Sequence, residues 1–234
     1  MMTRSRQPLF PPSFRAKLMA AALMGSAVAL GASVPALAQN QAEVSQAEIK
    51  DGIRFVENKA ETALEILRNP ELTVDAKAEK FRIFVNSTAD VHRVTRFVLG
   101  RYARGFSEEE YQEFTNLFKE YAFGVYESRL SDYEGENLKV IDAIPRRPGD
   151  MVVTTVATGG QLSEDTPVRW RIMKDKTGQW RLVDVEVFGV WLAIAQRQEF
   201  TTILNNNGGN PEALLNRLRK SVNKADAGSK KRQS

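Results

Sequence analysis

The sequence predicts an α+β fold, in which a four-stranded antiparallel sheet packs with several amphipathic helices around an apolar cavity. Apolar residues recur at three- and four-residue steps before Gly135, a spacing typical of amphipathic helices. After Gly135 the period changes to two, which is typical of strands, and beyond Gly189 it returns to the helical period. Helices, then strands joined by short turns, then helices again indicate an α+β protein.

The N-terminal segment has the three parts of a secretory signal peptide. Its basic part holds Arg4, Arg6, Arg15 and Lys17 and no acidic residue. An apolar run over residues 18–30 follows, too short to span a membrane, and then an A-x-A cleavage site at residues 36–38. We therefore expect residues 1–38 to be cleaved off after Ala38.

Removal of this segment changes the charge of the chain. The full sequence has 33 basic and 29 acidic residues, and loss of the four basic residues of the leader leaves 29 of each. The high isoelectric point therefore gives no support for nucleic-acid binding. There are no cysteines, so an exported chain of this kind depends on its core alone, and 196 mature residues suffice for one. We expect a soluble, unanchored protein in the periplasm.

Two helices are predicted in the first part of the mature chain. Residues 48–67 repeat apolar positions along one face, and Asn69-Pro70 ends that helix. Asp75 is expected to cap a second helix. Residues 86–90 interrupt it, and the apolar pattern then continues to Gly100.

A longer helix begins after Ser107. Ser107 and Glu110 form a capping box, in which each side chain accepts a hydrogen bond from an amide at the helix start. The helix runs to residue 130. One face of it is apolar and aromatic, with Tyr111, Phe114, Leu117, Phe118, Tyr121 and Val125.

Four strands follow, with the spacing of an antiparallel meander. They are expected at residues 138–141, 151–157, 167–173 and 180–187. The connections are residues 145–150, a loop at Gly159-Gly160, and residues 175–178, all rich in turn-forming residues.

A glycine corner after the last strand leads back to helix. Val185 and Val187 alternate with acidic residues on that strand, and Gly189 permits a sharp turn into a very apolar helix from residue 191 to 204. Pro211 begins a last helix with Leu214, Leu215 and Leu218. One domain is thus expected over residues 39–222, followed by a disordered basic tail over residues 223–234.

The residues for most kinds of catalysis are missing from the sequence. His92 is the only histidine, which argues against a histidine metal site or a catalytic triad, and no phosphate-binding glycine motif occurs. Asp184 and Glu186 share one strand face, with Arg169 and Arg171 on the neighbouring strand. We interpret these four as a solvated or salt-bridged surface. No cofactor and no metal ion are expected.

Six segments of the chain together match the pattern of a known family: VLGRYAR at residues 98–104, the helix at 114–126, the strand at 167–173, WRLVDV at 180–185, FGV at 188–190 and RQEF at 197–200. In this ordered set the chain resembles the MlaC family, the periplasmic phospholipid-binding component of the Mla lipid-transport system, also called the toluene-tolerance family. Two places depart from the family pattern: Trp191 stands for a serine, and Ala195-Gln196 for asparagine-tyrosine. A tryptophan in a cavity wall suits a ring-shaped ligand, so the related branch associated with hopanoid biosynthesis stays open.

The resemblance implies a carrier that holds a phospholipid by its acyl chains, with no enzymatic activity. Its implied partners are an inner-membrane ABC transporter with an MCE-domain subunit and an outer-membrane lipoprotein/porin complex. The residues expected to contact lipid are Phe97, Tyr102, Phe114, Leu117, Phe118, Tyr121, Val125, Val185, Val187, Phe188, Gly189, Trp191, Ile194 and Phe200.

Two other classes of function remain open from the sequence. One is a periplasmic adaptor whose interior is filled by its own side chains, and the other is an enzyme with Asp184 as its base. A cavity larger than ordinary small-ligand pockets would favour the carrier over the adaptor.

Overall fold

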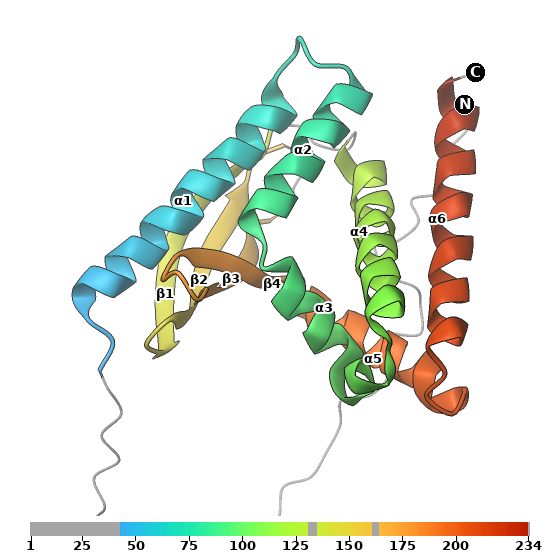
Figure 1. Cartoon of the computed structure of the whole chain (residues 1–234). Coiled ribbons are helices and arrows are strands. Elements are labelled where there is room, and N and C mark those ends of the chain that lie inside the picture. Colours follow the sequence, from blue (N-terminus) through green and yellow to red (C-terminus); the bar gives the residue numbers. More distant parts are fainter. Residues whose placement is uncertain (1–42, 131–134, 161–163, 234) are drawn as a thin grey trace, which may run out of the picture. The chain divides into compact units, whose positions relative to one another are not determined.

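The computed structural model describes residues 43–130, 135–160 and 164–233. The expected signal peptide at residues 1–38 lies outside them. Helices come first, then strands, then two further helices, so the α+β class is confirmed (Figure 1). The helices are α1 (Gln46–Arg68), α2 (Val74–Thr88), α3 (Val91–Leu99), the 3-10 helix η2 (Gly100–Gly105), α4 (Glu108–Leu130), α5 (Leu192–Asn206) and α6 (Pro211–Gln233).

The sheet has five antiparallel strands in the order of the chain, not the four that were predicted. The additional strand has two residues and pairs Val190 with Val187. It forms because Phe188 and Gly189 both take positive φ angles, 52° and 78°, the geometry of a tight two-residue hairpin. The five strands are β1 (Asn137–Arg147), β2 (Asp150–Thr158), β3 (Thr166–Lys174), β4 (Trp180–Val187) and β5 (Val190–Trp191).

The first strand is longer than the sequence predicted. It continues through Pro145 to Arg147, where we expected a loop, and only Pro148-Gly149 separates it from β2. A proline is tolerated there because β1 is the edge strand of the sheet and its outer side needs no amide donor.

The helix boundaries follow from local capping. Thr73, not Asp75, caps α2: the Thr73 hydroxyl accepts a hydrogen bond from the amide of Ala76, while Asp75 lies in the first turn. The predicted interruption between α2 and α3 is confirmed, and Asp90 caps α3 there. The same break is attached to the sheet, because the Asp90 amide donates to the carbonyl of Leu182 at 2.9 Å. The capping box at Ser107 and Glu110 also forms as predicted.

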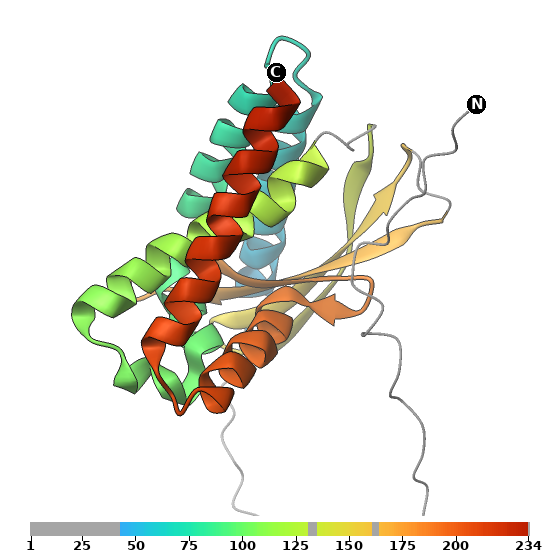
Figure 2. The ribbon, with the colours of Figure 1, turned by 90° about the vertical axis from the view of Figure 1, so that its right-hand side faces the viewer.

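Two separate apolar clusters hold the chain together. The sheet cluster joins α1 to one face of the sheet, through Val56, Met151, Val153, Ile172 and Trp180. The helical cluster joins α3, α4, α5 and α6, through Val98, Leu99, Phe114, Ala193, Phe200, Leu204, Leu214, Leu215 and Leu218. Helix α1 packs on β1 and β2 (Figure 1). Helix α4 packs on α6, α2 and α3 (Figure 2).

The last helix extends further than expected. Helix α6 runs to Gln233, so residues 223–233 are helical where the sequence predicted a disordered tail. Alanine and lysine are frequent in this stretch and proline is absent, which favours a helix.

The glycine corner gives a test of the hairpin. A Cβ on Gly189 would meet no atom within 4 Å, so only the positive φ angle penalises a side chain there. We expect Gly189→Val to lower the free energy of unfolding by about 1–3 kcal/mol. Gly189→Asn is the matched control, because asparagine tolerates positive φ, and it should cost clearly less. Urea unfolding of the two variants measures the difference. Equal stability of Gly189→Val and the parent would contradict this turn.

Candidate functional site

A row of apolar side chains crosses β3 and β4 on the face of the sheet that carries α1. Val168 lies opposite Val187, and Trp170 lies opposite Val185, so all four project from the same face. Trp170 also borders the sheet cluster, which identifies the face. Each of the four is only partly buried. Helix α1 packs over β1 and β2, so this apolar row (Val168, Trp170, Val185, Val187) lies to one side of its main contacts.

The aromatic face of α4 packs around Phe200 of α5. The ring centroids of Phe114 and Phe118 are each 5.8 Å from that of Phe200, and the centroid of Tyr121 is 6.2 Å away. Phe114 and Phe200 are 0% and 1% exposed and therefore serve as core. Leu117, Phe118 and Tyr121 remain half-buried. Burial, with a smaller contribution from the charge of Glu199, raises the pKa of Tyr121, which keeps its hydroxyl neutral.

The remaining predicted contact residues are scattered. Phe188 and Ile194 are 55% and 41% exposed, and Gly189 is exposed as well. Phe97 is half-buried beneath the guanidinium group of Arg197, which lies 4.9 Å from its ring centroid. The side chain of Val125 lies outside the described part of the structure.

Val187 and Trp191 do not face the same side, contrary to our expectation that both line one cavity. Val187 pairs with Val190, whereas Trp191 pairs with Glu186, so the two side chains leave opposite faces of the sheet. The hairpin at Phe188-Gly189 places Val190 in a strand before the helix, so the side chain of Trp191 lies on the face of the sheet opposite to the expected one. Val187 lies in the apolar row, and Trp191 belongs to the charged face.

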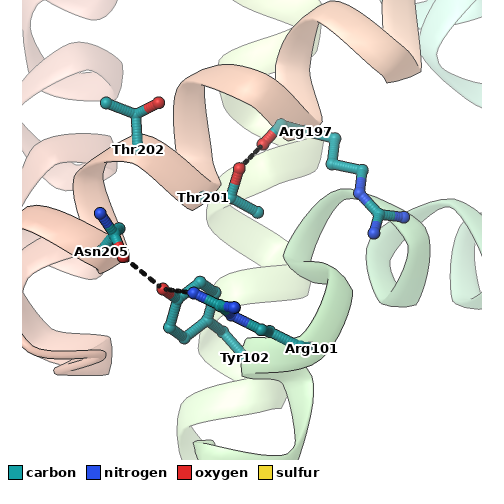
Figure 3. A pocket seen from close by; sticks show the side chains of 6 residues that line it. All are labelled: Arg101, Tyr102, Arg197, Thr201, Thr202 and Asn205. Atoms are coloured by element: carbon teal, nitrogen blue, oxygen red, sulfur yellow. Dashed lines mark hydrogen bonds between the residues drawn. The ribbon is translucent and has the colours of Figure 1, made fainter.

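Two depressions open on the helical side of the molecule. The first, of about 500 Å³, lies between η2 and α5 and is lined by Arg101, Tyr102, Arg197, Thr201, Thr202 and Asn205 (Figure 3). The second, of about 670 Å³, is lined by residues of α3, η2 and α4, among them His92, Arg96 and Tyr111. Of the predicted lipid-contact residues that the structure describes, Tyr102 alone lines either depression.

Asp184 acts as the cap of α5. One carboxylate oxygen accepts hydrogen bonds from the amide of Ala193 at 2.8 Å and from that of Val185 at 2.9 Å. Trp191, at the usual cap position, makes no side-chain bond to the helix, so β4 supplies the acceptor instead. Burial raises the pKa of Asp184, although these amides and Arg171 counteract it.

The neighbouring charges confirm part of the predicted ion-pair surface. Arg169 binds both carboxylate oxygens of Glu186, at 2.8 and 3.0 Å. Arg171 pairs with Asp150. The predicted salt bridge thus holds for Glu186, whereas Asp184 caps α5.

Asp184 accepts the cap hydrogen bonds of α5 and also carries a partly buried charge, and two substitutions separate the effects of these two features on stability. Asp184→Ala removes the acceptor and should lower the free energy of unfolding by about 1 kcal/mol. Asp184→Asn keeps an oxygen at the cap without a charge, so its fold should be retained. Because the pKa is raised on folding, the ionised parent loses stability as pH rises through that pKa, and Asp184→Asn does not.

Urea unfolding between pH 3 and 8 measures both effects, over a range that includes the ordinary pKa of an aspartate of about 4. Asp184→Asn should gain stability relative to the parent as pH rises. A relative loss over the same range would contradict the raised pKa.

The sequence does not indicate every residue of the apolar row or of the first depression. Val168 and Trp170 alternate on β3, but only the register with β4 places them beside Val185 and Val187. Arg197 lines the first depression together with Arg101 and Tyr102 because α5 packs against η2. No local sequence pattern predicts this packing.

The described residues meet the requirements of neither a metal site nor a membrane-spanning helix. Over 43–130, 135–160 and 164–233, no three histidine, cysteine, aspartate or glutamate side chains gather as metal ligands would. Within the same ranges, no helix has the length and hydropathy to cross a membrane.

Comparison with known proteins identifies a family and a similar fold. The family model described as MlaC protein matches residues 57–220 of this chain. A solved structure of a phospholipid-binding protein from Ralstonia solanacearum, in complex with a phospholipid, is similar in fold, with a TM-score of 0.68 and 19% sequence identity. The match covers 75% of this chain and 99% of that one.

Proposed function

Since the chain belongs to the MlaC family, we propose that it is a periplasmic carrier that holds the acyl chains of a phospholipid and passes the lipid between membrane complexes. The observation that carries this proposal is the apolar row on β3 and β4. Four large apolar side chains, Val168, Trp170, Val185 and Val187, are paired across two strands and only partly buried.

The energetics of acyl chains require a covered site. Burial of each methylene group contributes about 0.8 kcal/mol, so exposure of two acyl chains of ordinary length to water costs on the order of 20 kcal/mol. A shallow surface cannot bury enough of the chains to offset this cost. We propose that the chains lie on the apolar row, with Leu117, Phe118 and Tyr121 of α4 on their other side.

The arrangement of the two apolar clusters supports this placement. Helix α4 packs on other helices, while the apolar row belongs to the face of the sheet cluster. Acyl chains placed between α4 and the row would open neither cluster. The cavity thus forms around the ligand at a lower cost than disruption of one continuous core.

The proposed partners follow from the family. An inner-membrane ABC transporter with an MCE-domain subunit and an outer-membrane lipoprotein/porin complex would exchange lipid with the carrier. Catalysis has no part in this function, and Asp184 serves the fold: Asp184→Asn should leave lipid retention unchanged.

Extraction of the purified mature protein tests the proposal. The protein is purified under native conditions, extracted with organic solvent, and the extract is analysed by mass spectrometry. We expect about one phospholipid per protein molecule. Hopanoid in its place would assign the chain to the hopanoid-associated branch, and a folded protein that carries no lipid would refute the carrier function.

A further inference from the structure

The depression between η2 and α5 carries two positive charges and several polar groups. Arg101 comes from η2 and Arg197 from α5, and Thr201, Thr202 and Asn205 follow on the same helix as Arg197 (Figure 3). Among the residues that the structure describes, neither arginine forms an ion pair with a carboxylate. By contrast, Arg169, Arg171, Arg181 and Arg219 each bind an acidic side chain.

Both guanidinium groups are positioned by aromatic rings instead. Arg197 lies over Phe97, and Arg101 lies 5.0 Å from the ring centroid of Tyr102. The Tyr102 hydroxyl accepts a hydrogen bond from Arg101 at 2.9 Å and donates one to Asn205 at 3.3 Å. A guanidinium group stacked on a ring keeps most of its N–H donors available for a further acceptor.

Polar side chains of α5 also line the depression. The hydroxyl of Thr201 donates to the carbonyl of Arg197 at 2.6 Å, and that of Thr202 donates to the carbonyl of Gln198 at 2.7 Å. Figure 3 shows Thr201 on α5 next to Arg197, above the guanidinium group of Arg101 in this view. The volume of about 500 Å³ is ample for a phosphate group with part of the molecule that bears it.

We propose that this depression binds a phosphate-type oxyanion, either the phosphate of a lipid headgroup or a soluble phosphate. Planar guanidinium groups match the geometry of phosphate oxygens, and two arginines without acidic partners favour an anion. The site is distinct from the apolar row, so the inference does not require acyl-chain binding.

Titration of the mature protein with inorganic phosphate at constant ionic strength tests the site, with amide resonances followed by NMR. We expect saturable shifts at η2 and α5. Arg101→Gln should weaken phosphate binding roughly tenfold or more. The matched control is Arg104→Gln, an exposed arginine of the same 3-10 helix that does not line the depression, and it should bind phosphate as the parent does.

A second pair of variants tests whether a loss of phosphate binding comes from misfolding. Arg197→Gln should also weaken binding, Arg197→Lys should retain part of it, and circular dichroism verifies the fold of both. Shifts that do not saturate, or binding that is equal in the parent and in Arg101→Gln, would overturn the proposal.

Comparison of lipid-loaded with delipidated protein identifies the source of the phosphate. Competition by glycerophosphoethanolamine, with phosphate binding only to delipidated protein, assigns the site to a lipid headgroup. Equal phosphate binding to both forms assigns it to a soluble phosphate. Failure of phosphate binding by the delipidated form of a protein that carried lipid when it was purified overturns this inference alone and leaves the proposed function in place.

Discussion

Val187→Asp should abolish lipid retention while the protein stays folded. Val187 lies opposite Val168 in the apolar row and is only partly buried. Its substitution therefore changes the ligand surface more than the core. A carboxylate against hydrocarbon costs several kcal/mol, and each ~1.4 kcal/mol weakens binding about tenfold. The lipid content of natively purified protein measures the effect, with circular dichroism as the test of folding.

Ile141→Asp is the matched control for this prediction. Ile141 is an apolar residue of the same sheet but is 58% exposed on the edge strand β1, away from the row. The same change of side chain there should leave lipid content as in the parent. A Val187→Asp protein that is folded and fully loaded would refute the placement of acyl chains on the row.

Phe200→Ala should cause the largest loss of stability. Phe200 is 1% exposed and contacts the rings of Phe114, Phe118 and Tyr121, so its removal leaves a cavity in the helical cluster. Substitutions of this kind cost roughly 3–5 kcal/mol, a large share of the total stability of an ordinary domain. Urea unfolding monitored by circular dichroism measures the loss.

Phe188→Ala provides the comparison for Phe200→Ala. Phe188 is 55% exposed in the hairpin turn, and its loss should change the free energy of unfolding by less than about 0.5 kcal/mol. Similar effects of the two substitutions would mean that Phe200 is not a core residue and is free to line a ligand cavity, as the sequence first predicted.

The order of elements could be predicted from the sequence because it depends on local patterns. The period of three and four residues marked α1, and the capping box marked the start of α4. The fifth strand was missed because two residues carry no periodicity, and Phe188-Gly189 is not a common hairpin pair. The sequence predicts a turn at Pro145 because the tolerance of a proline in a strand depends on β1 lying at the sheet edge, which no local pattern shows.

The site could be predicted less well, because the burial of a side chain and the face that it occupies depend on contacts between distant segments. Val185 and Val187 were recognised by alternation, but Val168 and Trp170 join them only through the register of β3 with β4. Phe114 and Phe200 have the same residue type as Phe118, and the crossing of α4 with α5 decides which of them is core. The sequence predicts the wrong face for Trp191 because the strand residue before the helix has no signal of its own in the sequence.

Photo-crosslinking with a phospholipid that carries a diazirine in its acyl chain tests the central claim most directly. The loaded mature protein is irradiated and digested, and the labelled peptides are identified by mass spectrometry. The account predicts labels on the strands that form the apolar row, at Val168 to Trp170 and Val185 to Val187, and on the half-buried face of α4. Labels confined to other segments, with these strands unmodified in a fully loaded protein, would contradict it.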